Sequence, residues 1–392
     1  MWRNAFLGGR PIRAGLPALL LVAWIALPLS ARQTQGQTDW RLEPFVRLGE
    51  LDGPLALTEI GGVVVVEGNL AIAQSMERLI RVVSPSGALV RTIGRQGEGP
   101  GEFRRIDFLG WVDDELMTVD LGLRRITYFS PTGEVLRTHR LPQPPIDPPA
   151  LWIGQPFGAS SGRVILTASV PYNELPRLPV VLATMAGEVL DTLAWFDPQA
   201  LGFRVEYAGN RGVGGPHPMR QDLRSVSPNG RTFVKVLGAG NSVEVTWYDT
   251  ETREQQRRRI HSPAVAVPAG LVEHVQDSML ALFNANGIPA TSREVRDGMP
   301  FPTELVGASL VRAVNDGGVW FQEPALAGAG RYWRRVTQAG GQDIRVELPA
   351  SIQILDQVGD TVWAKDVDEF GVNYVVGYLL HGPSRGTPRR QP

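Results

Sequence analysis

The sequence predicts an all-β fold of repeated antiparallel sheets, and three observations support this prediction. The first is an internal repeat, because Asn69–Thr92 and Glu115–Thr138 align without a gap at an offset of 46 residues. The second is a Ser-Pro-x-Gly turn between two apolar runs in each copy, a sequence that fixes the backbone of a hairpin. The third is that strand-like runs continue in the same rhythm toward the C-terminal end. Periods of about 40 to 50 residues are typical of four-stranded propeller blades.

The repeat defines the strands of the first two blades. In the first copy, apolar or alternating runs predict strands within Gly62–Gly68, Leu70–Gln74, Arg78–Ser84 and Ala88–Gly94. The second copy supplies the second blade in the same order. Four weaker units follow, the third blade at 162–195, the fourth at 227–260, the fifth at 315–349 and the sixth at 357–381.

The sixth unit lacks a last strand, whereas Trp40–Glu50 is a strand-like run ahead of the first blade. A ring of sheets must hide its two open edges. We therefore predict that the N-terminal strand completes the last blade. The resulting fold is a six-bladed β-propeller, with seven blades or another β-fold as the alternatives.

The run Ile93–Phe103, IGRQGEGPGEF, lies between the outer strand of the first blade and the inner strand of the second. A phosphate-binding loop would need a G-K-[ST] sequence and a following helix, and the run has neither. We predict a crossover between blades in which Gly99-Pro100-Gly101 makes the sharp turn. Phe103 then packs between the two sheets.

One segment is helical by its pattern. In Pro268–Gly287 the apolar side chains recur at three- and four-residue steps, at Val272, Val275, Met279, Leu282 and Phe283. Proline suits the start of a helix and glycine its end. We predict one helical insertion, at about 264–300, between blades four and five. It is interpreted either as structural cover or as a lid over the channel.

The two ends of the chain are predicted to lie outside the propeller, which spans 40–382. Arg3, Arg10 and Arg13 precede the apolar run Leu16–Leu29, the pattern of a secretion signal. We predict a signal peptide at 1–31, a polar linker at 32–39 and a disordered tail at 383–392. An uncleaved anchor is the alternative to cleavage near Ala31. The mature protein is then secreted or periplasmic, with no membrane span.

Composition excludes several classes of function. The net charge is −1, which argues against nucleic acid as the main partner because phosphate contacts need a basic surplus. The chain has no cysteine, which excludes disulfides, thiolate nucleophiles and cysteine-bound zinc. The five scattered histidines form no cluster that would support a Ser-His-Asp triad.

The second copy also carries a family resemblance. A glycine-rich loop, an aspartate, an Arg-Ile pair and an aromatic residue follow one another, at Gly94, Gly97, Gly99, Pro100, Gly101, Phe103, Asp120, Arg125, Ile126 and Phe129. This segment resembles the NHL-type repeat over one blade and its crossover. In the first copy Gln74 replaces the aspartate, and beyond Leu141 only the rhythm is shared. The resemblance implies a six-bladed propeller like secreted bacterial ones, many of unassigned function.

Metal chemistry is weakly indicated. The five histidines are not spaced to converge on a metal, unlike those of amidating lyases, the zinc enzymes of the NHL group. Propellers similar to sugar lactonases and paraoxonases hold a divalent cation such as calcium with carboxylate and amide oxygens. The oxygen candidates here are Asp107, Asp113, Asp114, Asn315 and Asp316. Most of them are predicted to lie in turns instead.

The leading hypothesis is an extracytoplasmic, non-catalytic module that binds a small molecule, a glycan or a protein. The residues chosen as ligand contacts are Trp320, Trp363, Asp107 and Arg104, because tryptophan offers a stacking face and the other two offer charge. No catalytic or cofactor-binding residue is assigned. The alternative hypothesis is a calcium-dependent hydrolase or lactonase with its site in the central channel, and a third is a structural scaffold.

Overall fold

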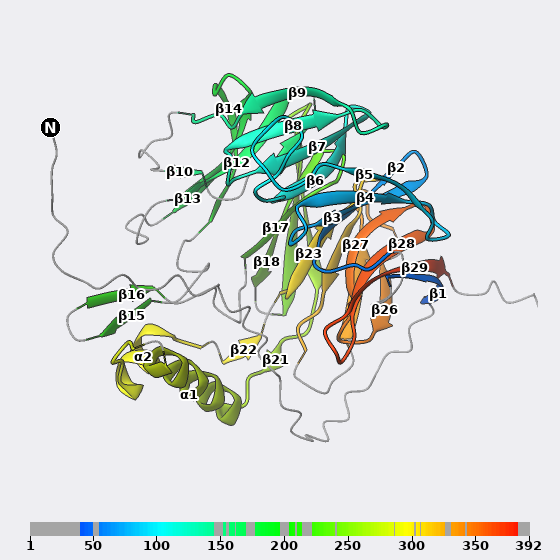
Figure 1. Cartoon of the computed structure of the whole chain (residues 1–392). Coiled ribbons are helices and arrows are strands. Elements are labelled where there is room, and N and C mark those ends of the chain that lie inside the picture. Colours follow the sequence, from blue (N-terminus) through cyan, green and yellow to red (C-terminus); the bar gives the residue numbers. More distant parts are fainter. Residues whose placement is uncertain are drawn as a thin grey trace, which may run out of the picture.

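The computed structural model describes residues 40–49, 55–144, 152–153, 157–160, 162–169, 177–196, 204–207, 210–213, 222–239, 241–285, 287–301, 303–305, 307–325, 331–341 and 343–382. The predicted signal peptide, linker and tail, and most of the proline-rich stretch after Leu141, lie outside these residues. The model is a six-bladed, all-β propeller with two short helices (Figure 1).

Each blade is one antiparallel sheet, and its strands follow chain order from the inner to the outer edge except in blade six, whose outer strand comes from the N-terminal part of the propeller. Blade one contains β2 Ile60–Val66, β3 Asn69–Gln74, β4 Leu79–Val83 and β5 Leu89–Ile93. Blade two contains β6 Phe108–Val112, β7 Glu115–Asp120, β8 Arg125–Phe129 and β9 Val135–Arg140. Blade three contains β10 Trp152–Ile153, β11 Phe157–Ala159, β12 Arg163–Ser169, β13 Leu178–Thr184 and β14 Val189–Phe196.

The remaining three blades follow the same plan. Blade four contains β17 Asp222–Val226, β18 Thr232–Ala239, β19 Ser242–Asp249 and β20 Gln255–His261. Blade five contains β23 Leu310–Ala313, β24 Val319–Gln322, β25 Arg331–Val336 and β26 Ile344–Leu348. Blade six contains β27 Gln353–Val358, β28 Thr361–Val367, β29 Asn373–His381 and the N-terminal β1 Arg41–Leu48.

The ring closes as the sequence predicts. β1 pairs with β29 in antiparallel register from Arg41 opposite His381 to Leu48 opposite Val375, and both lie at the same side of the ring in Figure 1. The pairing hides one edge of β29 that would otherwise be open. The first and last strands of the propeller therefore belong to one sheet.

The repeat is visible in the turns. Gly87 and Gly133 both have φ of +92°, and each donates its N–H to the Ser that opens the Ser-Pro-x-Gly sequence at 2.9 Å. Gly187 does the same in blade three with Thr184 as the acceptor. Only glycine adopts such a conformation without strain, so the sequence fixes the outer hairpin of three blades.

The crossover Ile93–Phe103 runs between β5 and β6, as predicted. Phe103 is buried among side chains of blades one and two. The carboxylate of Glu102 accepts the backbone N–H groups of Glu98 and Gly99 at 3.0 and 2.8 Å. Arg125 donates from the next hairpin to the carbonyl oxygens of Glu98 and Gly99, both at 2.9 Å. The glycine-rich run is therefore a fixed structural loop.

Two further segments form a small body beside the ring, which we call the satellite. It contains the hairpin β15 Arg204–Tyr207 and β16 Asn210–Val213, and the helices α1 Ala269–Ala285 and α2 Ser292–Gly298. Val205 of the hairpin and Val275, Met279 and Phe283 of α1 share a separate apolar cluster. Figure 1 shows these elements together, away from the sheets.

The satellite joins two distant parts of the chain. Its hairpin follows β14 and its helices lie between β20 and β23 in chain order. The two chain segments that carry the helices pair as β21 Val265–Ala266 and β22 Glu304–Leu305. Both insertions begin after the last strand of a blade, so they leave the ring at the same face and can pack together.

Candidate functional site

The inner strands of the six blades surround the axis of the ring. They are β2, β6, the β10–β11 pair, β17, β23 and β27, the first strands of their sheets. Neighbouring inner strands contact one another, among them β17 with β23, β23 with β27 and β27 with β2. In a propeller the side chains of these strands line the central channel. Charged side chains on them are therefore the first candidates for a functional site.

Arg312 is a half-buried arginine on β23. Its neighbours Val311 and Ala313 are buried in the cluster between blades four and five. Side chains alternate along a strand, so Arg312 points to the other face of its sheet, toward blade six. Burial lowers the pKa of its guanidinium, because the charged form loses hydration. No carboxylate in the described part of the chain forms an ion pair with it.

Arg312 begins a row of three residues across blade five. It stands opposite Trp320 on β24, and Trp320 stands opposite Arg335 on β25. The indole N–H of Trp320 donates to Oε1 of Gln357 at 2.7 Å, and Nε of Arg335 donates to the same oxygen at 2.9 Å. Arg335 also pairs with the carboxylate of Asp316. One arginine of the row is thus neutralised and the other is not.

Blade six has an equivalent row with different chemistry. Asp356 on β27 stands opposite Trp363 on β28, which stands opposite Gly377 on β29. Asp356 is fully buried, with Oδ1 accepting the N–H of Gln357 at 2.8 Å. Its Oδ2 has no hydrogen-bond partner among the residues that the structure describes.

The buried carboxyl of Asp356 keeps its proton to a much higher pH than an exposed aspartate does. Its pKa is raised to about 7, chiefly by burial, and the negative charge of Asp316 acts in the same direction. The N–H groups of Gln357 and Val65 act in the opposite direction, because they favour the charged form. Val65 belongs to β2, so Asp356 lies at the joint between blades six and one.

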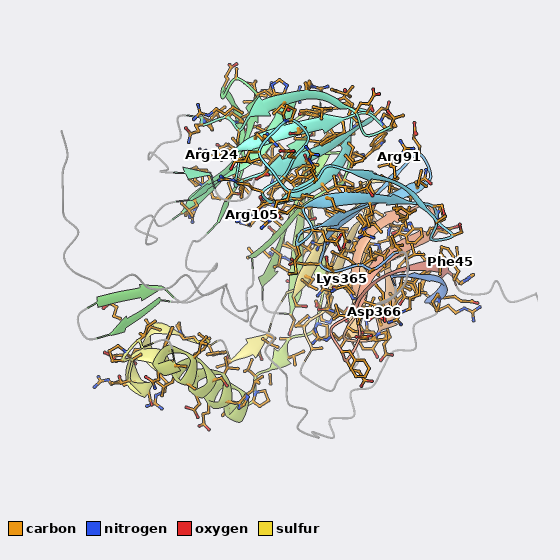
Figure 2. The ribbon with its side chains drawn as sticks, viewed as in Figure 1. Phe45, Arg91, Arg105, Arg124, Lys365 and Asp366 are labelled. Atoms are coloured by element: carbon orange, nitrogen blue, oxygen red, sulfur yellow. The ribbon has the colours of Figure 1, made fainter. Side chains whose placement is uncertain are left out.

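Lys365 is a second half-buried cation, near the end of β28 (Figure 2). Burial lowers the pKa of its ammonium group, while the negative charge of Glu59 opposes this shift. No acid in the described ranges lies within ion-pair distance of it. Its neighbour Asp366 is by contrast paired with Arg47 at 3.2 Å. Lys365 and Arg312 are thus two cations without a described ion pair, on strands next to β27.

At one end of the inner strands, just beyond Ala313 of β23, turns from different blades are tied together. The N–H of Trp111 on β6 donates to the carbonyl oxygen of Pro228 in blade four at 2.9 Å. The N–H of Asn229 donates to Oδ1 of Asn315 in blade five at 2.8 Å. These bonds link blades two, four and five and leave Asn315 occupied as a turn residue.

Two of the predicted ligand contacts, Trp320 and Trp363, lie in the packing between blades. Trp320 is fully buried and Trp363 is 4% exposed. Trp363 packs at 5.7 Å and 68° against Phe45 of the closing strand β1. Both tryptophans adjoin the charged inner-strand residues, since each stands opposite one of them.

The other two predicted contacts, Asp107 and Arg104, lie at the crossover into blade two, near Arg105 in Figure 2. Oδ2 of Asp107 accepts the N–H of Leu121 at 2.8 Å, and Oδ1 pairs with Arg105 at 2.7 Å. The backbone N–H of Arg104 donates to Oδ2 of Asp120 at 2.8 Å, and its side chain pairs with Glu98. The structure therefore places the four predicted contacts in two separate regions.

The metal candidates are turn residues. Asp113 and Asp114 have φ of +53° and +61° and form the tight turn between β6 and β7. Asp316 lies in the turn between β23 and β24, where Oδ1 accepts the N–H of Gly318 at 2.8 Å. Within the described residues, no group of three His, Asp or Glu side chains is placed to hold a metal ion.

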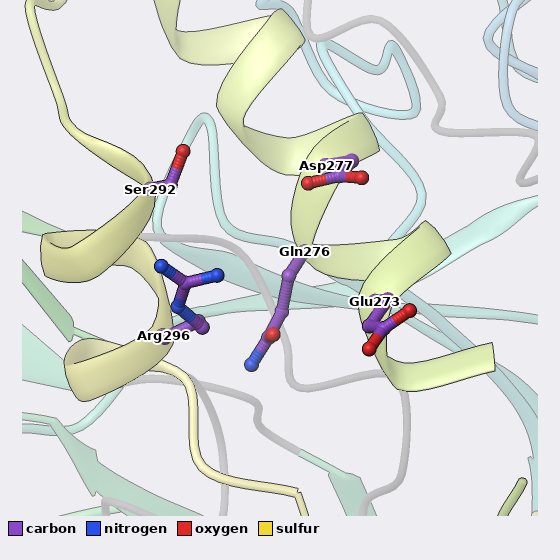
Figure 3. A pocket seen from close by; sticks show the side chains of 5 residues that line it. All are labelled: Glu273, Gln276, Asp277, Ser292 and Arg296. Atoms are coloured by element: carbon purple, nitrogen blue, oxygen red, sulfur yellow. The ribbon is translucent and has the colours of Figure 1, made fainter. Parts of the chain in front are cut away.

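The satellite contains a pocket of about 160 Å³ between its two helices (Figure 3). Its polar walls are formed by Glu273, Gln276, Asp277, Ser292 and Arg296. All of these except Gln276 are exposed, and Gln276 donates to the carbonyl oxygen of Met299 at 3.3 Å. The pocket is a solvated groove between helices.

Sequence reasoning missed several features that now stand out. Arg312 and Asp356 are each the one charged residue in the apolar run that forms the first strand of a blade. The alternation of apolar and polar residues along these runs could have pointed to them. Helix α2 was also missed, although Thr291 and Glu294 form a capping box that its sequence announces. The split inner strand of blade three, β10 and β11, had no visible signal.

No helix in the described ranges is long and apolar enough to cross a membrane. The predicted signal segment lies outside those ranges, so its cleavage stays a prediction.

Comparison with known proteins agrees with the fold. A family model described as a 6-bladed beta-propeller matches residues 54–148. No curated protein matches the chain in sequence. A crystal structure of a DUF4221 family member from Bacteroides vulgatus is similar with a TM-score of 0.51 and 10% identity, covering 88% of this chain and 100% of that one. A calcium-binding regucalcin from Agrobacterium tumefaciens gives a TM-score of 0.41 and 14% identity, covering 87% and 96%.

Proposed function

We propose that this protein is an extracytoplasmic, non-catalytic binding module that holds its ligand at the axis of the ring, beside β23 and β27. The observation that carries the proposal is the presence of two half-buried cations, Arg312 and Lys365, with no described acid within ion-pair distance of either. A charge that is partly removed from water and left unpaired costs stability. A ligand that supplies the missing interactions accounts for such residues.

The predicted contacts extend this proposal. Trp320 stands opposite Arg312 and forms the rigid wall behind it, and Trp363 holds the equivalent place in blade six. Asp107 and Arg104 are proposed as contacts at the crossover face, where their backbone bonds fix the loop. The segment at about 264–300 is proposed as an insertion between blades four and five that adds surface at that face. A glycan or protein partner would use the same face.

We also propose that the blades are NHL-type repeats and that the protein is exported from the cytoplasm. We propose that residues 1–31 are removed and that the mature propeller, 40–382, works in the periplasm or outside the cell. N-terminal sequencing of protein recovered from a periplasmic or culture fraction tests this. An intact N-terminus in the cytosolic fraction would contradict it.

The binding role is tested by nondenaturing mass spectrometry of the full mature protein after incubation with a metabolite extract of its host. A retained small molecule that slows hydrogen exchange in β23 and β27 supports the proposal. Failure to retain any small molecule contradicts it, and so does protection confined to α1 and α2. Turnover of a lactone that depends on added calcium would instead favour the hydrolase alternative.

A further inference from the structure

We infer that Arg312 is an oxyanion-binding site and that the ligand carries a carboxylate, an inference that rests on the proposed binding role. It names the chemical class of ligand and one residue that recognises it. Arg312 has unused hydrogen-bond donors, differs in this from the other arginines of blade five, and lies in fixed surroundings.

The first step is the count of donors. A guanidinium has five N–H donors in a planar fork. Among the described residues, Arg312 uses Nη1 for one bond, to the carbonyl oxygen of Val311 at 3.2 Å. None of its nitrogen atoms is among the sealed, unpartnered atoms of the described chain. The remaining donors are therefore accessible and unused by the protein.

The second step compares Arg312 with its neighbours. The other arginines of blade five are matched with acceptors: Arg335 pairs with Asp316, while Arg334 and Arg345 share Glu323 at 2.8 and 2.9 Å. Arg331 also lies near an acceptor, Oε1 of Gln322, at 3.4 Å. The arginines that stabilise the blade are thus paired with carboxylates or placed near another acceptor. Arg312 is the exception in the described part of this blade, and it lies on the strand nearest the axis.

The third observation is that the surroundings of Arg312 are rigid. Trp320, opposite Arg312, is fully buried and fixed by its bond to Gln357, and Ala313 donates its N–H to Oγ of Ser225 at 3.0 Å. The backbone of β23 is therefore held from both sides. A preorganised guanidinium that is half-buried binds an anion more strongly than one in water.

The fourth step chooses the anion. A planar fork matches the two oxygens of a carboxylate in a bidentate pair. Phosphate shares the oxyanion chemistry and is an outcome of the test. The half-buried position favours a small anion over a polyanion, because further negative charge would lack partners there.

The test measures binding of glucuronate, glucose and inorganic phosphate to the full mature protein by calorimetry. Glucose is the neutral counterpart of glucuronate, so the pair isolates the carboxylate. The variants are Arg312→Met, Arg312→Lys and a matched control, Arg293→Met, whose side chain is 87% exposed on α2. Thermal unfolding checks that each variant is folded.

We expect glucuronate to bind and glucose to bind much more weakly. Arg312→Met should weaken glucuronate binding by about 10- to 100-fold, the loss typical of a charge-assisted hydrogen bond. Arg312→Lys should restore part of the affinity, and Arg293→Met should leave it unchanged. Preference for phosphate with the same dependence on Arg312 would support the oxyanion site and change the ligand to a phosphate.

Two results would overturn the inference. One is equal affinity of wild type and Arg312→Met for the anions. The other is no anion binding by folded wild type. If a neutral metabolite from the extract still protects β23 and β27, the binding role survives and only the oxyanion assignment fails.

Discussion

Blades five and six place a tryptophan at the same position of their second strand, yet the two tryptophans have different surroundings. Trp320 stands between Arg312 and Arg335, and Trp363 stands between Asp356 and Gly377. In blade five the third position carries a guanidinium that bonds to blade six through Gln357. In blade six the third position is Gly377, which has no side chain, and Phe45 of β1 occupies the space next to it.

The difference shows that a tryptophan at the same position of the repeat has a different structural role in each blade. In blade five the tryptophan joins neighbouring blades through polar bonds, while in blade six it anchors the strand that closes the ring. The inner residue of each row is charged, but the sign and burial differ. Arg312 is half-buried and accessible, whereas Asp356 is sealed. The first therefore suits a ligand, and the second acts on stability.

The largest effect is expected from removing the tryptophans themselves. Trp320→Ala and Trp363→Ala should each lower the free energy of unfolding by about 3–5 kcal/mol, because each leaves a cavity between blades. The two should differ at β1, where hydrogen exchange of Arg41–Leu48 should accelerate strongly only in Trp363→Ala. Chemical denaturation and hydrogen exchange measure the two quantities. Equal exchange of β1 in both variants would erase the distinction between the rows.

Next in size is the pH dependence caused by Asp356. The pKa of the buried carboxyl is about 7, against an ordinary value of 3.8, so the folded state binds a proton that the unfolded state releases. Stability is then lost as pH rises from about 4 to 7. Asp356→Asn should remove this loss and raise the free energy of unfolding at pH 8 by about 2–4 kcal/mol.

Denaturation of wild type and Asp356→Asn at pH 5 and pH 8 measures this effect. The gain should be larger at pH 8 than at pH 5. Arg312→Met, on the equivalent position of blade five, is the control and should show no such pH dependence in this range. A gain that is the same at both pH values would show that the carboxyl stays charged when folded.

A smaller effect is expected from filling the space at Gly377. A Cβ there would lie 2.7 Å from Cζ of Phe45 and 2.7 Å from Cζ3 of Trp363. Gly377→Ala should therefore destabilise the protein by about 1–3 kcal/mol through overpacking. Gly270→Ala on α1, where a Cβ meets nothing within 4 Å, is the matched control and should be neutral or stabilising. Unchanged stability of Gly377→Ala would mean that β1 can move away without loss.

The smallest effects separate the two arginines of blade five. Arg335→Met should lower the free energy of unfolding by about 1–2 kcal/mol, because Gln357 and Asp316 lose a charged partner. Arg312→Met should leave stability unchanged or raise it slightly, since no described acid depends on it. Chemical denaturation of both variants decides between them. A larger loss for Arg312→Met would indicate a structural role for that residue.

The architecture was predictable because its signals are local or repetitive. The gapless repeat of Asn69–Thr92 predicted the four-stranded blade, and the Ser-Pro-x-Gly turns predicted the outer hairpins. Because the sixth unit lacked a fourth strand, the extra strand at Trp40–Glu50 was predicted to complete it. The crossover loop was also predictable, because its glycine-rich run is a local signal. Glu102 and Arg125, which both bond to Gly99, lie in that run and later in the same repeat. Apart from the closing strand, which pairs with the far end of the chain, these predictions used residues close in sequence or one repeat apart.

The candidate site was not predictable to the same degree. Trp320 was recognised by its chemistry, but its opposite neighbour Arg312 was passed over because the two are separated by a turn and look unrelated along the chain. Asp356 stands out as a charge in an apolar run, but its burial depends on the contact of β27 with β2, between opposite ends of the sequence. Charge compensation depends on such distant neighbours, and one sequence does not reveal them.

The pairing of β1 with β29 has a consequence for biosynthesis. Arg41–Leu48, the first of the described strands to be synthesised, finds its partner Asn373–His381 only after more than 300 further residues have been made. Until then Phe45 and the edge of the first strand have no place to dock. The last blade can therefore assemble only when these two segments have both been made and can meet.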